Sequence, residues 1–329
     1  MKLLITGFSG FVSQHFLNFL EENAEDAEVC GIDINKPTFD YGNYKNIQVK
    51  FYTVNLLEPD TLNIILDIFR PEFILHLASF SSVAYSWKHP IECFNNNTNI
   101  FLNIVDTVHK LKLNCRILSV GSSEEYGNVT EQDIPLFEEN KVLPCSPYAV
   151  ARVSQEMLSN LYVNSYGLDI VMTRSFNHIG PLQDTRFVIP SFITRILKIK
   201  QEGKQEGTIE TGDLSIIRDF VDVRDVVKAY YNLLVYGKIG ELYNICSGKG
   251  IALRDIVNMI SNITGIRVNT VINSEYIRVN DNHIIIGSYE KIEKDIGWRP
   301  IIPIEKTLRD MVGYYEKIND NGCYKKFDN

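Results

Sequence analysis

Short apolar segments alternate with amphipathic ones through the first half of the chain. Residues that suit buried strands, apolar or β-branched, lie at 3–6, 28–33, 48–54, 73–77 and 116–120. Between them, apolar residues at helical spacing predict helices that begin at Phe11 and extend over 58–69 and 97–111. Regular alternation of strand and helix is typical of a parallel, doubly wound sheet with right-handed crossovers. The pattern therefore predicts an α/β fold.

The pattern is less regular after residue 174. It predicts helices at 188–200 and 221–236 and short strands between residues 208 and 218. We expect the charged residues early in the second helix to face solvent; they are Asp222, Arg224 and Asp225.

The change in pattern also suggests domain boundaries. Residues 1–174 are predicted to form the first domain, and residues 175–318 mainly a smaller lobe. Residues 319–329, where Asn, Asp, Gly and Lys dominate, are predicted to be a loose tail. A chain of 329 residues is long enough to bury a sizeable core in this arrangement.

A glycine turn follows the first predicted strand at once. Gly7 and Gly10 precede the helix that begins near Phe11, and Ser13 occupies the third place of a G-x-x-G-x-x-G pattern. Glycine permits positive φ and close approach to phosphates, and the start of a helix offers free N–H groups and a positive dipole end. This order predicts a Rossmann-type domain that binds a dinucleotide pyrophosphate; a tight turn without a ligand is the alternative.

The second predicted strand ends in an acidic residue, Asp33. A carboxylate there accepts hydrogen bonds from the adenine ribose 2′-hydroxyl and repels a 2′-phosphate, which favours NAD over NADP. Lys36 lies nearby and keeps NADP open.

Ligands of such sheets bind beyond the carboxyl ends of the strands. The predicted cofactor-binding residues in and around the loops after the strands are Gly7, Phe8, Ser9, Gly10, Phe11, Val12, Asp33, Asn55, Leu56, Leu77, Ala78 and Ser79, and Asn97 is added to them. His76 lies inside an apolar strand, and we expect it to be a buried structural histidine rather than a catalytic one.

The candidate chemistry centres on Tyr148 and Arg152. Pro147 suits the first position of a helix, so these two residues, four apart, share one helix face. A neighbouring cation stabilises the phenolate and makes the phenol a better acid–base group. Ser122, at the end of a strand, can hydrogen-bond the same substrate oxygen. The alternative is an exposed Tyr–Arg pair on a solvated helix.

Charge and composition limit the classes of partner that this chain can have. The formal net charge is −8, which argues against nucleic acid, and no apolar run approaches the roughly 20 residues of a membrane span. We expect no signal peptide, because the first strand begins at residue 2. Six scattered cysteines without a C-x-x-C pair indicate reduced thiols in a cytoplasmic protein, with no metal site.

The chain resembles the extended short-chain dehydrogenase/reductases, in the branch that modifies nucleotide sugars. The stretches that carry the resemblance are the glycine turn and residues 119–127, 146–152, 174–181, 218–224, 243–248 and 297–300. Gly-Ser-Ser-Glu-Glu-Tyr-Gly at 121–127, with Phe-Asn-His-Ile-Gly-Pro at 176–181 and Phe-Val-Ile-Pro-Ser-Phe at 187–192, is most similar to GDP-4-keto-6-deoxy-D-mannose reductases. It is also similar to GDP-mannose 4,6-dehydratases.

The resemblance implies catalytic roles. Ser122 falls at the residue that polarises the sugar oxygen, and Tyr148 at the acid–base tyrosine. Arg152 falls where the family has a lysine that also binds the nicotinamide ribose, so the resemblance implies that Tyr148 and Arg152 bind the cofactor as well. Arginine keeps the charge, but its rigid planar fork differs from a compact ammonium. Glu124 falls at the glutamate with which the dehydratases remove water across C5–C6.

The resemblance also implies how substrate binds. A nucleotide-diphosphate sugar, GDP-linked by preference, would lie between the first domain and the smaller lobe, and the chain would cross between the two. The residues implied in its binding are Ser123, Asn177, Arg218, Arg278 and Asp281, although the usual proline after the second arginine is Val279. A homodimer is implied too, paired through helices 97–111 and 148–166, whose apolar faces packing within one chain would explain equally well.

These observations leave several functions open. The first is NAD(P)H-dependent reduction of a 4-keto nucleotide sugar. The second is a 4,6-dehydratase in which Glu124 moves a proton, and the third is a 4-epimerase. The alternative of another class is a non-catalytic nucleotide-sugar binder, with Arg152 as the trace of lost chemistry.

Overall fold

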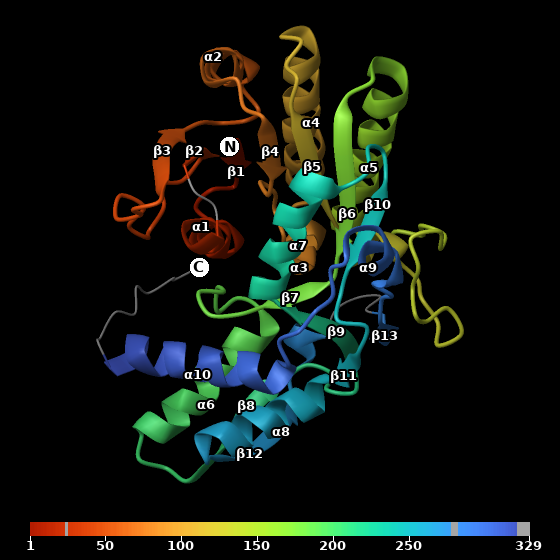
Figure 1. The fold of residues 1–329 in the computed structure, drawn as a ribbon. Helices are drawn as coiled ribbons and strands as arrows, with labels where there is room; N and C mark the ends of the chain where they lie inside the picture. Colours follow the sequence, from red (N-terminus) through yellow and green to blue (C-terminus); the bar gives the residue numbers. More distant parts are fainter. Residues whose placement is uncertain (24–25, 278–281, 321–329) are drawn as a thin grey trace.

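A parallel sheet forms the larger part of the molecule (Figure 1). The computed structural model describes the chain except residues 24–25, 278–281 and 321–329. Within the described residues the sheet has seven strands in the order β10–β6–β5–β4–β1–β2–β3, all paired in parallel. They are β1 (Lys2–Thr6), β2 (Ala27–Asp33), β3 (Ile47–Thr53), β4 (Phe73–His76), β5 (Arg116–Ser122), β6 (Asp169–Ser175) and β10 (Leu242–Ile245). The strand order reverses between β1 and β4, which is where such sheets bind ligands.

Helices cover both faces of this sheet. α1 (Phe11–Asn23) and α7 (Val223–Tyr236) pack on one face, and their apolar side chains join those of the strands in one core cluster. The other face is covered by helices that share a second cluster: α2 (Pro59–Phe69), α4 (Pro90–Lys110) and α5 (Pro147–Tyr166). Two short helices lie beside these layers: α3 (Val83–Lys88) contacts α4 and α5, and α9 (Glu290–Ile296) contacts β10 and α7. The predicted doubly wound α/β fold is confirmed.

The smaller lobe lies below the sheet in Figure 1. Its helices pack together around one apolar cluster; they are α6 (Val188–Gln201), α8 (Leu253–Thr264) and α10 (Ile304–Asp320). Its short strands are β7 (Asn177–Ile179), β8 (Glu206–Thr211), β9 (Ile217–Asp222), β11 (Gly250–Ala252), β12 (Arg267–Ile272) and β13 (Ile284–Ile285). α7 and β10 follow β9 in the chain but belong to the large sheet and its cover, so the chain passes between the two parts more than once.

Some predicted boundaries differ from the structure. α4 begins at Pro90 rather than residue 97, because proline suits the first turn and the polar residues after it lie on the exposed side of the helix. α10 continues to Asp320, so the first two residues of the predicted tail are helical. The rest of that tail lies outside the described residues.

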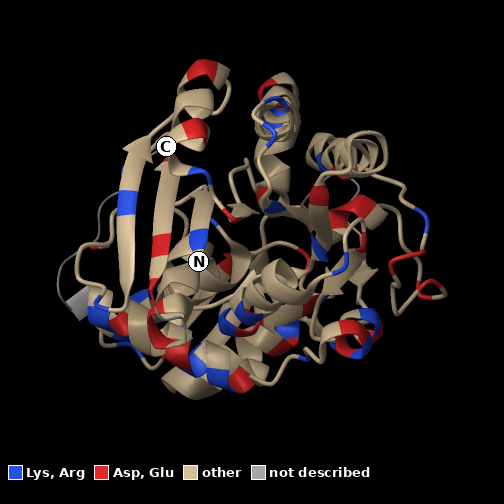
Figure 2. Cartoon of the chain, turned by 45° about the horizontal axis from the view of Figure 1, so that its top comes forward, with Lys and Arg blue, Asp and Glu red and all other residues tan. Residues whose placement is uncertain are grey.

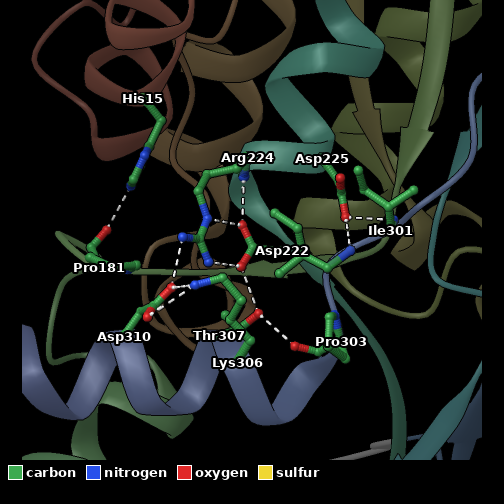
Figure 3. A network of polar contacts seen from close by, with 11 residues as sticks. His15, Pro181, Asp222, Arg224, Asp225, Ile301, Pro303, Lys306, Thr307 and Asp310 are labelled. Carbon is green, nitrogen blue, oxygen red and sulfur yellow. Dashed lines mark hydrogen bonds and ion pairs between the residues drawn. The ribbon is translucent and has the colours of Figure 1, made fainter.

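The expectation that Asp222, Arg224 and Asp225 face solvent was wrong for both aspartates, and Arg224 is half-buried. α7 begins at Val223, and Asp222 ends β9 and caps the helix, accepting a hydrogen bond from the Arg224 N–H at 2.8 Å. Both aspartates are 2% exposed. Asp222 accepts from Arg224 and Thr307, and Asp225 accepts from the Ile301 N–H (Figure 3). The N–H of Ile302 also donates to Asp225. These carboxylates join α7 to α10 and the segment before it.

Charge is distributed without a single-sign stripe in the view of Figure 2, where acidic and basic residues are interspersed along the ribbons. None of the described helices combines the length and the apolar composition needed to cross a bilayer.

Candidate active site

The loop between β1 and α1 packs closely against the loop that follows β4. Gly7 has a φ of +69°, and a Cβ atom there would lie 2.7 Å from the amide nitrogen of Ala78. The carbonyl of Gly7 accepts a hydrogen bond from the N–H of Gly10 at 3.1 Å, and Gly10 is exposed. Glycine at position 7 is therefore required by the backbone conformation and by the contact between the two loops.

The start of α1 is suited to an anion. The helix begins directly after the glycine turn and has no acidic residue in its first turn, so no carboxylate of its own competes for the free N–H groups. The side chains of two predicted cofactor residues, Phe8 and Val12, lie in the core. They can therefore offer a ligand only backbone atoms, whereas Ser9 and Phe11 are partly exposed.

Asp33, the last residue of β2, faces the glycine turn. Its Oδ2 accepts a hydrogen bond from the Ser9 N–H at 2.9 Å, and its Oδ1 accepts one from the Asn35 N–H at 3.0 Å. Each carboxylate oxygen has a further lone pair. Asp33 can therefore accept a hydrogen bond from a ribose hydroxyl while it holds the loop.

Thr6 and His76 support the loop after β4. Thr6 Oγ1 accepts hydrogen bonds from the N–H groups of Leu77 and Ala78 at 3.2 and 3.1 Å, so its own hydrogen points to His76 Nδ1 at 2.8 Å. His76 therefore carries its hydrogen on Nε2 and is neutral. Burial, and after it the charge of Arg152, lowers the pKa of His76 to about 3. His76 is buried, as predicted.

Other predicted cofactor residues are occupied within the protein. Asn97 is fully buried, and its side chain accepts from the N–H of Phe80 at 2.7 Å and donates to the carbonyl of Phe80 at 3.0 Å. Asn97 therefore positions the loop after β4 through bonds within the protein. Asn55 bonds to the start of α2 through Leu57 and Glu58, and Leu56 is buried in the core.

α5 brings Tyr148 and Arg152 together inside the protein. Ser146 caps the helix and Pro147 is its first residue. Tyr148 is 6% exposed and Arg152 is 5% exposed, and Arg152 Nε donates a hydrogen bond to Tyr148 Oη at 3.2 Å. Arg152 Nη2 donates to Ser79 Oγ at 2.5 Å. The alternative of a Tyr–Arg pair on a solvated helix face is excluded by this burial.

Ser122 ends β5 at the carboxyl edge of the sheet, the edge at which the glycine turn and the loop after β4 also lie. Ser122 is followed by the 3₁₀ turn η1 (Ser123–Tyr126), and its N–H donates to Glu125 Oε1 at 2.7 Å. Glu125 is fully buried, whereas Glu124 is partly exposed. Burial, and then the neighbouring carboxylate of Glu156, raises the pKa of Glu125 well above its usual value. No pattern in the sequence predicts Glu125 as a residue of this site.

Residues 4–311 match a protein family described as GDP-mannose 4,6 dehydratase. This range includes the glycine turn, the Ser122 turn and the Tyr148–Arg152 helix. The chain belongs to the GDP-mannose 4,6 dehydratase family.

Individual relatives of this family agree in sequence and in structure. The GDP-6-deoxy-D-mannose reductase of Pseudomonas aeruginosa is 30% identical over 317 residues, which is 96% of this chain and 97% of the relative. The structure of RMD from Pseudomonas aeruginosa complexed with NADPH has a TM-score of 0.83 at 30% identity and covers 96% of this chain and 99% of its own. The UDP-glucose 4-epimerase of Thermotoga maritima, solved with UDP-glucose, has a TM-score of 0.86 at 28% identity, with 97% and 100% covered. The resemblance to nucleotide-sugar enzymes of the extended short-chain dehydrogenase/reductases is confirmed.

Some of the predicted substrate-binding residues lie in the smaller lobe. Asn177 starts β7, which pairs with β9, the strand that carries Arg218. Arg218 is 7% exposed, and its Nη1 donates to the carbonyl of Ile217 at 2.9 Å. Ser123 is buried in the turn after β5. Arg278 and Asp281 lie outside the described residues.

Gln155 is, after Glu125, a second residue of the site that was not predicted from the sequence. It is 1% exposed, and its Oε1 accepts a hydrogen bond from Arg152 Nη1 at 2.8 Å. The available signal was its place three residues after Arg152 on the same helix face. A glutamine in a helix is common enough that this spacing alone did not single it out.

Proposed function

We propose that this chain reduces the 4-keto group of a GDP-4-keto-6-deoxy-hexose with NAD(P)H. The observation that carries the proposal is a continuous series of contacts from the glycine turn to the phenol. Gly7 packs against Ala78, the adjacent Ser79 accepts a hydrogen bond from Arg152, and Arg152 donates one to Tyr148. Carbonyl reduction needs a hydride donor and a proton donor held side by side. The similarity to a GDP-6-deoxy-D-mannose reductase supports this reaction.

The chain's own residues would supply the proton and the charge stabilisation. Reduced nicotinamide, when bound, supplies the hydride to the carbonyl carbon. Tyr148 Oη gives its proton to the carbonyl oxygen, so that the ketone becomes an alcohol and the phenol becomes a phenolate. The guanidinium of Arg152, whose Nε lies 3.2 Å from Tyr148 Oη, stabilises that phenolate. Ser122 donates a hydrogen bond to the same substrate oxygen and polarises the carbonyl.

The residues around the glycine turn fit NAD(P). Gly7 and Gly10 allow the backbone to approach a pyrophosphate, and the first turn of α1 offers N–H groups without an opposing carboxylate. Asp33 favours NAD, because a carboxylate accepts from a 2′-hydroxyl and repels a 2′-phosphate. NADP remains open, since a similar structure, RMD from Pseudomonas aeruginosa, was solved with NADPH.

The smaller lobe would bind the nucleotide diphosphate. Arg218 is suited to a diphosphate because its fork can donate two hydrogen bonds to phosphate oxygens. Asn177, Ser123 and Arg278 would contact the phosphates or nearby groups, and Asp281 would bind the ribose of the nucleotide. The GDP-linked form is preferred because the Pseudomonas reductase acts on a GDP-sugar.

We also propose a homodimer formed through α4 and α5. Large apolar side chains on these helices are exposed in the single chain: Ile91 (77%), Phe94 (39%), Met157 (68%) and Leu161 (52%). Covering such a surface with a second copy removes it from water. A reducing, cytoplasmic location is proposed with it, because the five described cysteines are free thiols.

The test uses GDP-4-keto-6-deoxy-D-mannose with NADH and, separately, with NADPH. We expect consumption of the reduced nicotinamide, with NADH preferred, and formation of the 6-deoxy alcohol. Tyr148→Phe should lower kcat by about 10²–10⁴-fold. Its unfolding free energy should fall by only about 1–3 kcal/mol, because the buried ring remains and only the acceptor of the Arg152 Nε–H is lost. A Tyr148→Phe variant with the native rate would show that the catalytic assignment is wrong.

A second reaction mixture distinguishes the alternatives. It contains GDP-mannose and no added NADH. Appearance of a 4-keto-6-deoxy product there would reject the reductase in favour of a 4,6-dehydratase that uses Glu124, and a C4-epimer would favour an epimerase. No turnover in either mixture would favour a nucleotide-sugar binder.

A further inference from the structure

The guanidinium of Arg152 is held on three of its sides. Nε donates to Tyr148 Oη at 3.2 Å, and Nη2 donates to Ser79 Oγ at 2.5 Å. Nη1 donates twice, to the carbonyl of Val120 at 3.0 Å and to Gln155 Oε1 at 2.8 Å. Because the guanidinium is planar and rigid, fixing Nη1 and Nη2 also fixes where the Nε–H points.

Gln155 is itself fixed by neighbours that leave its amide one orientation. Its Nε2 donates to Ser119 Oγ at 2.9 Å and to the carbonyl of Val120 at 3.2 Å. Ser119 Oγ also accepts a hydrogen bond from Ser159 Oγ at 3.1 Å. With its nitrogen facing acceptors, Gln155 must turn its oxygen toward Arg152. Ser119 and Ser159 are both at most 3% exposed, so this arrangement is shielded from water.

A lysine at position 152 would not need this support. An ammonium is a compact point charge with three donors that rotate freely, so it can meet a phenol from several directions. A guanidinium meets the phenol productively only when one particular N–H is aimed at it. The neutral oxygen of Gln155 aims it without cancelling its charge, whereas a carboxylate in the same place would neutralise it.

We propose that Gln155 is a positioning residue for the reaction: its buried amide fixes the guanidinium of Arg152 so that the Nε–H faces Tyr148. Gln155 does not touch the substrate. It allows an arginine to stabilise the Tyr148 phenolate at position 152, where the family resemblance implies a lysine. This role rests on the proposed function of Tyr148 and Arg152.

The test is a double-mutant cycle between Gln155→Met and Arg152→Lys. In the native background, Gln155→Met should lower kcat by about 10–100-fold, part of the effect of general acid catalysis, with little change in KM for the sugar. In the Arg152→Lys background the same substitution should change kcat by less than about 3-fold, because an ammonium needs no anchor. Equal losses in both backgrounds would show a merely structural role and overturn the proposal.

A pH profile provides a second readout. In Gln155→Met the alkaline limb of the kcat/KM profile should move to higher pH, because the cation no longer stabilises the phenolate as well. A structural defect would lower the plateau and leave the limb in place. Gln155→Glu keeps an acceptor for Arg152 but adds a carboxylate, and it should also lose rate and move this limb. A limb unmoved in both variants would overturn the proposal.

The control is Gln201→Met, the same substitution at an exposed residue at the end of α6. It should keep the native rate and profile. Failure of this inference is separable from failure of the proposed function. Native turnover with an unchanged Gln155→Met variant overturns the inference alone. Native-rate turnover by Tyr148→Phe, or no native turnover at all, overturns the proposed function and this inference with it.

Discussion

Arg152 and Arg224 are both anchored by several hydrogen bonds, but their partners differ in charge. Arg152 donates to a phenol, a serine hydroxyl, a backbone carbonyl and a glutamine amide, all neutral groups. Arg224 donates to two carboxylates, those of Asp222 and Asp310, each at 2.7 Å (Figure 3). In the described part of the chain, no carboxylate oxygen forms an ion pair with Arg152 within 4.0 Å. Neutral partners do not neutralise the charge of Arg152, so it can stabilise a phenolate. The carboxylate partners of Arg224 neutralise its charge, and their ion pairs join α7 to α10.

The histidines near these two arginines show the same contrast. Burial lowers the pKa of His76, and the charge of Arg152 lowers it further. Burial also lowers the pKa of His15, but there the hydrogen bond to the Pro181 carbonyl and the charge of Asp222 oppose the shift. The charge of Arg152 therefore lowers the pKa of His76, whereas the charges of Asp222 and Arg224 shift the pKa of His15 in opposite directions.

The largest expected effect comes from removing each cation in turn. Arg152→Met should lower kcat by about 10²–10⁴-fold, because the phenolate loses its stabilising charge. Arg224→Met should lower the unfolding free energy by about 3 kcal/mol, because the buried carboxylate of Asp222 loses its ion-pair partner. Turnover per folded Arg224→Met molecule should stay near native. Steady-state kinetics and urea unfolding of both variants give the comparison.

The contrast between the two regions would be refuted by the opposite pattern. That pattern is an Arg152→Met variant that keeps its rate and loses most of its stability, or an Arg224→Met variant that loses its rate while its stability is unchanged.

The second effect is a pH dependence of stability from His76. Its pKa is 6.5 when unfolded and about 3 when folded, so between these values only the unfolded chain binds the proton. The stabilisation is complete above pH 6.5 and is lost as the pH falls toward 3. By pH 5 the loss should be about 2 kcal/mol. We expect the unfolding free energy of His76→Asn to fall less steeply between pH 6.5 and 4.5 than that of the native protein.

His178 also contributes to the pH dependence of stability and must be separated from His76. Burial lowers the pKa of His178 to about 4, so it contributes a slope of the same sign that His76→Asn retains. The difference between the two slopes therefore reports His76 alone. Parallel slopes for the native protein and the variant would show that His76 does not carry the effect.

The smallest expected effect is at the outer carboxylate of the Arg224 region. Asp310 is 30% exposed, and Arg224 keeps its bonds to Asp222 when Asp310 is neutralised. Asp310→Asn should lower the unfolding free energy by about 0.5–1 kcal/mol, and less at high salt. Glu316→Gln, which breaks a surface ion pair with Lys200, is the matched control. A loss at Asp310 as large as that of Arg224→Met would show that the outer carboxylate, not Asp222, joins α10 to α7.

Sequence reasoning succeeded where one local segment holds the information. The strand, glycine turn and helix around Gly7 are contiguous, and Tyr148 and Arg152 are one helical turn apart. Strand-end residues such as Asp33 and Ser122 could be placed because the ends of parallel strands meet at one edge of the sheet.

It failed where a distant segment decides burial. Asp222 is buried because Thr307, far along the chain, donates to it at 2.6 Å, and no periodicity within α7 contains that information. Glu124 and Glu125 are adjacent, and only the geometry of the turn after β5 decides which carboxyl turns inward. Gln155 could be placed on the right helix face, but its role depends on Ser119 from β5.

The two hydrogen bonds that Asp33 accepts have a consequence for changing coenzyme preference by design. Exchanging this carboxylate for an apolar or basic residue, the obvious route to a phosphorylated ribose, also removes the acceptors for the N–H groups of Ser9 and Asn35. The loops at Ser9 and Asn35, which would have to bind the new phosphate, would lose the hydrogen bonds that hold them in place. A redesigned variant would therefore need a replacement acceptor, such as an asparagine side-chain oxygen, before any added positive charge could be used.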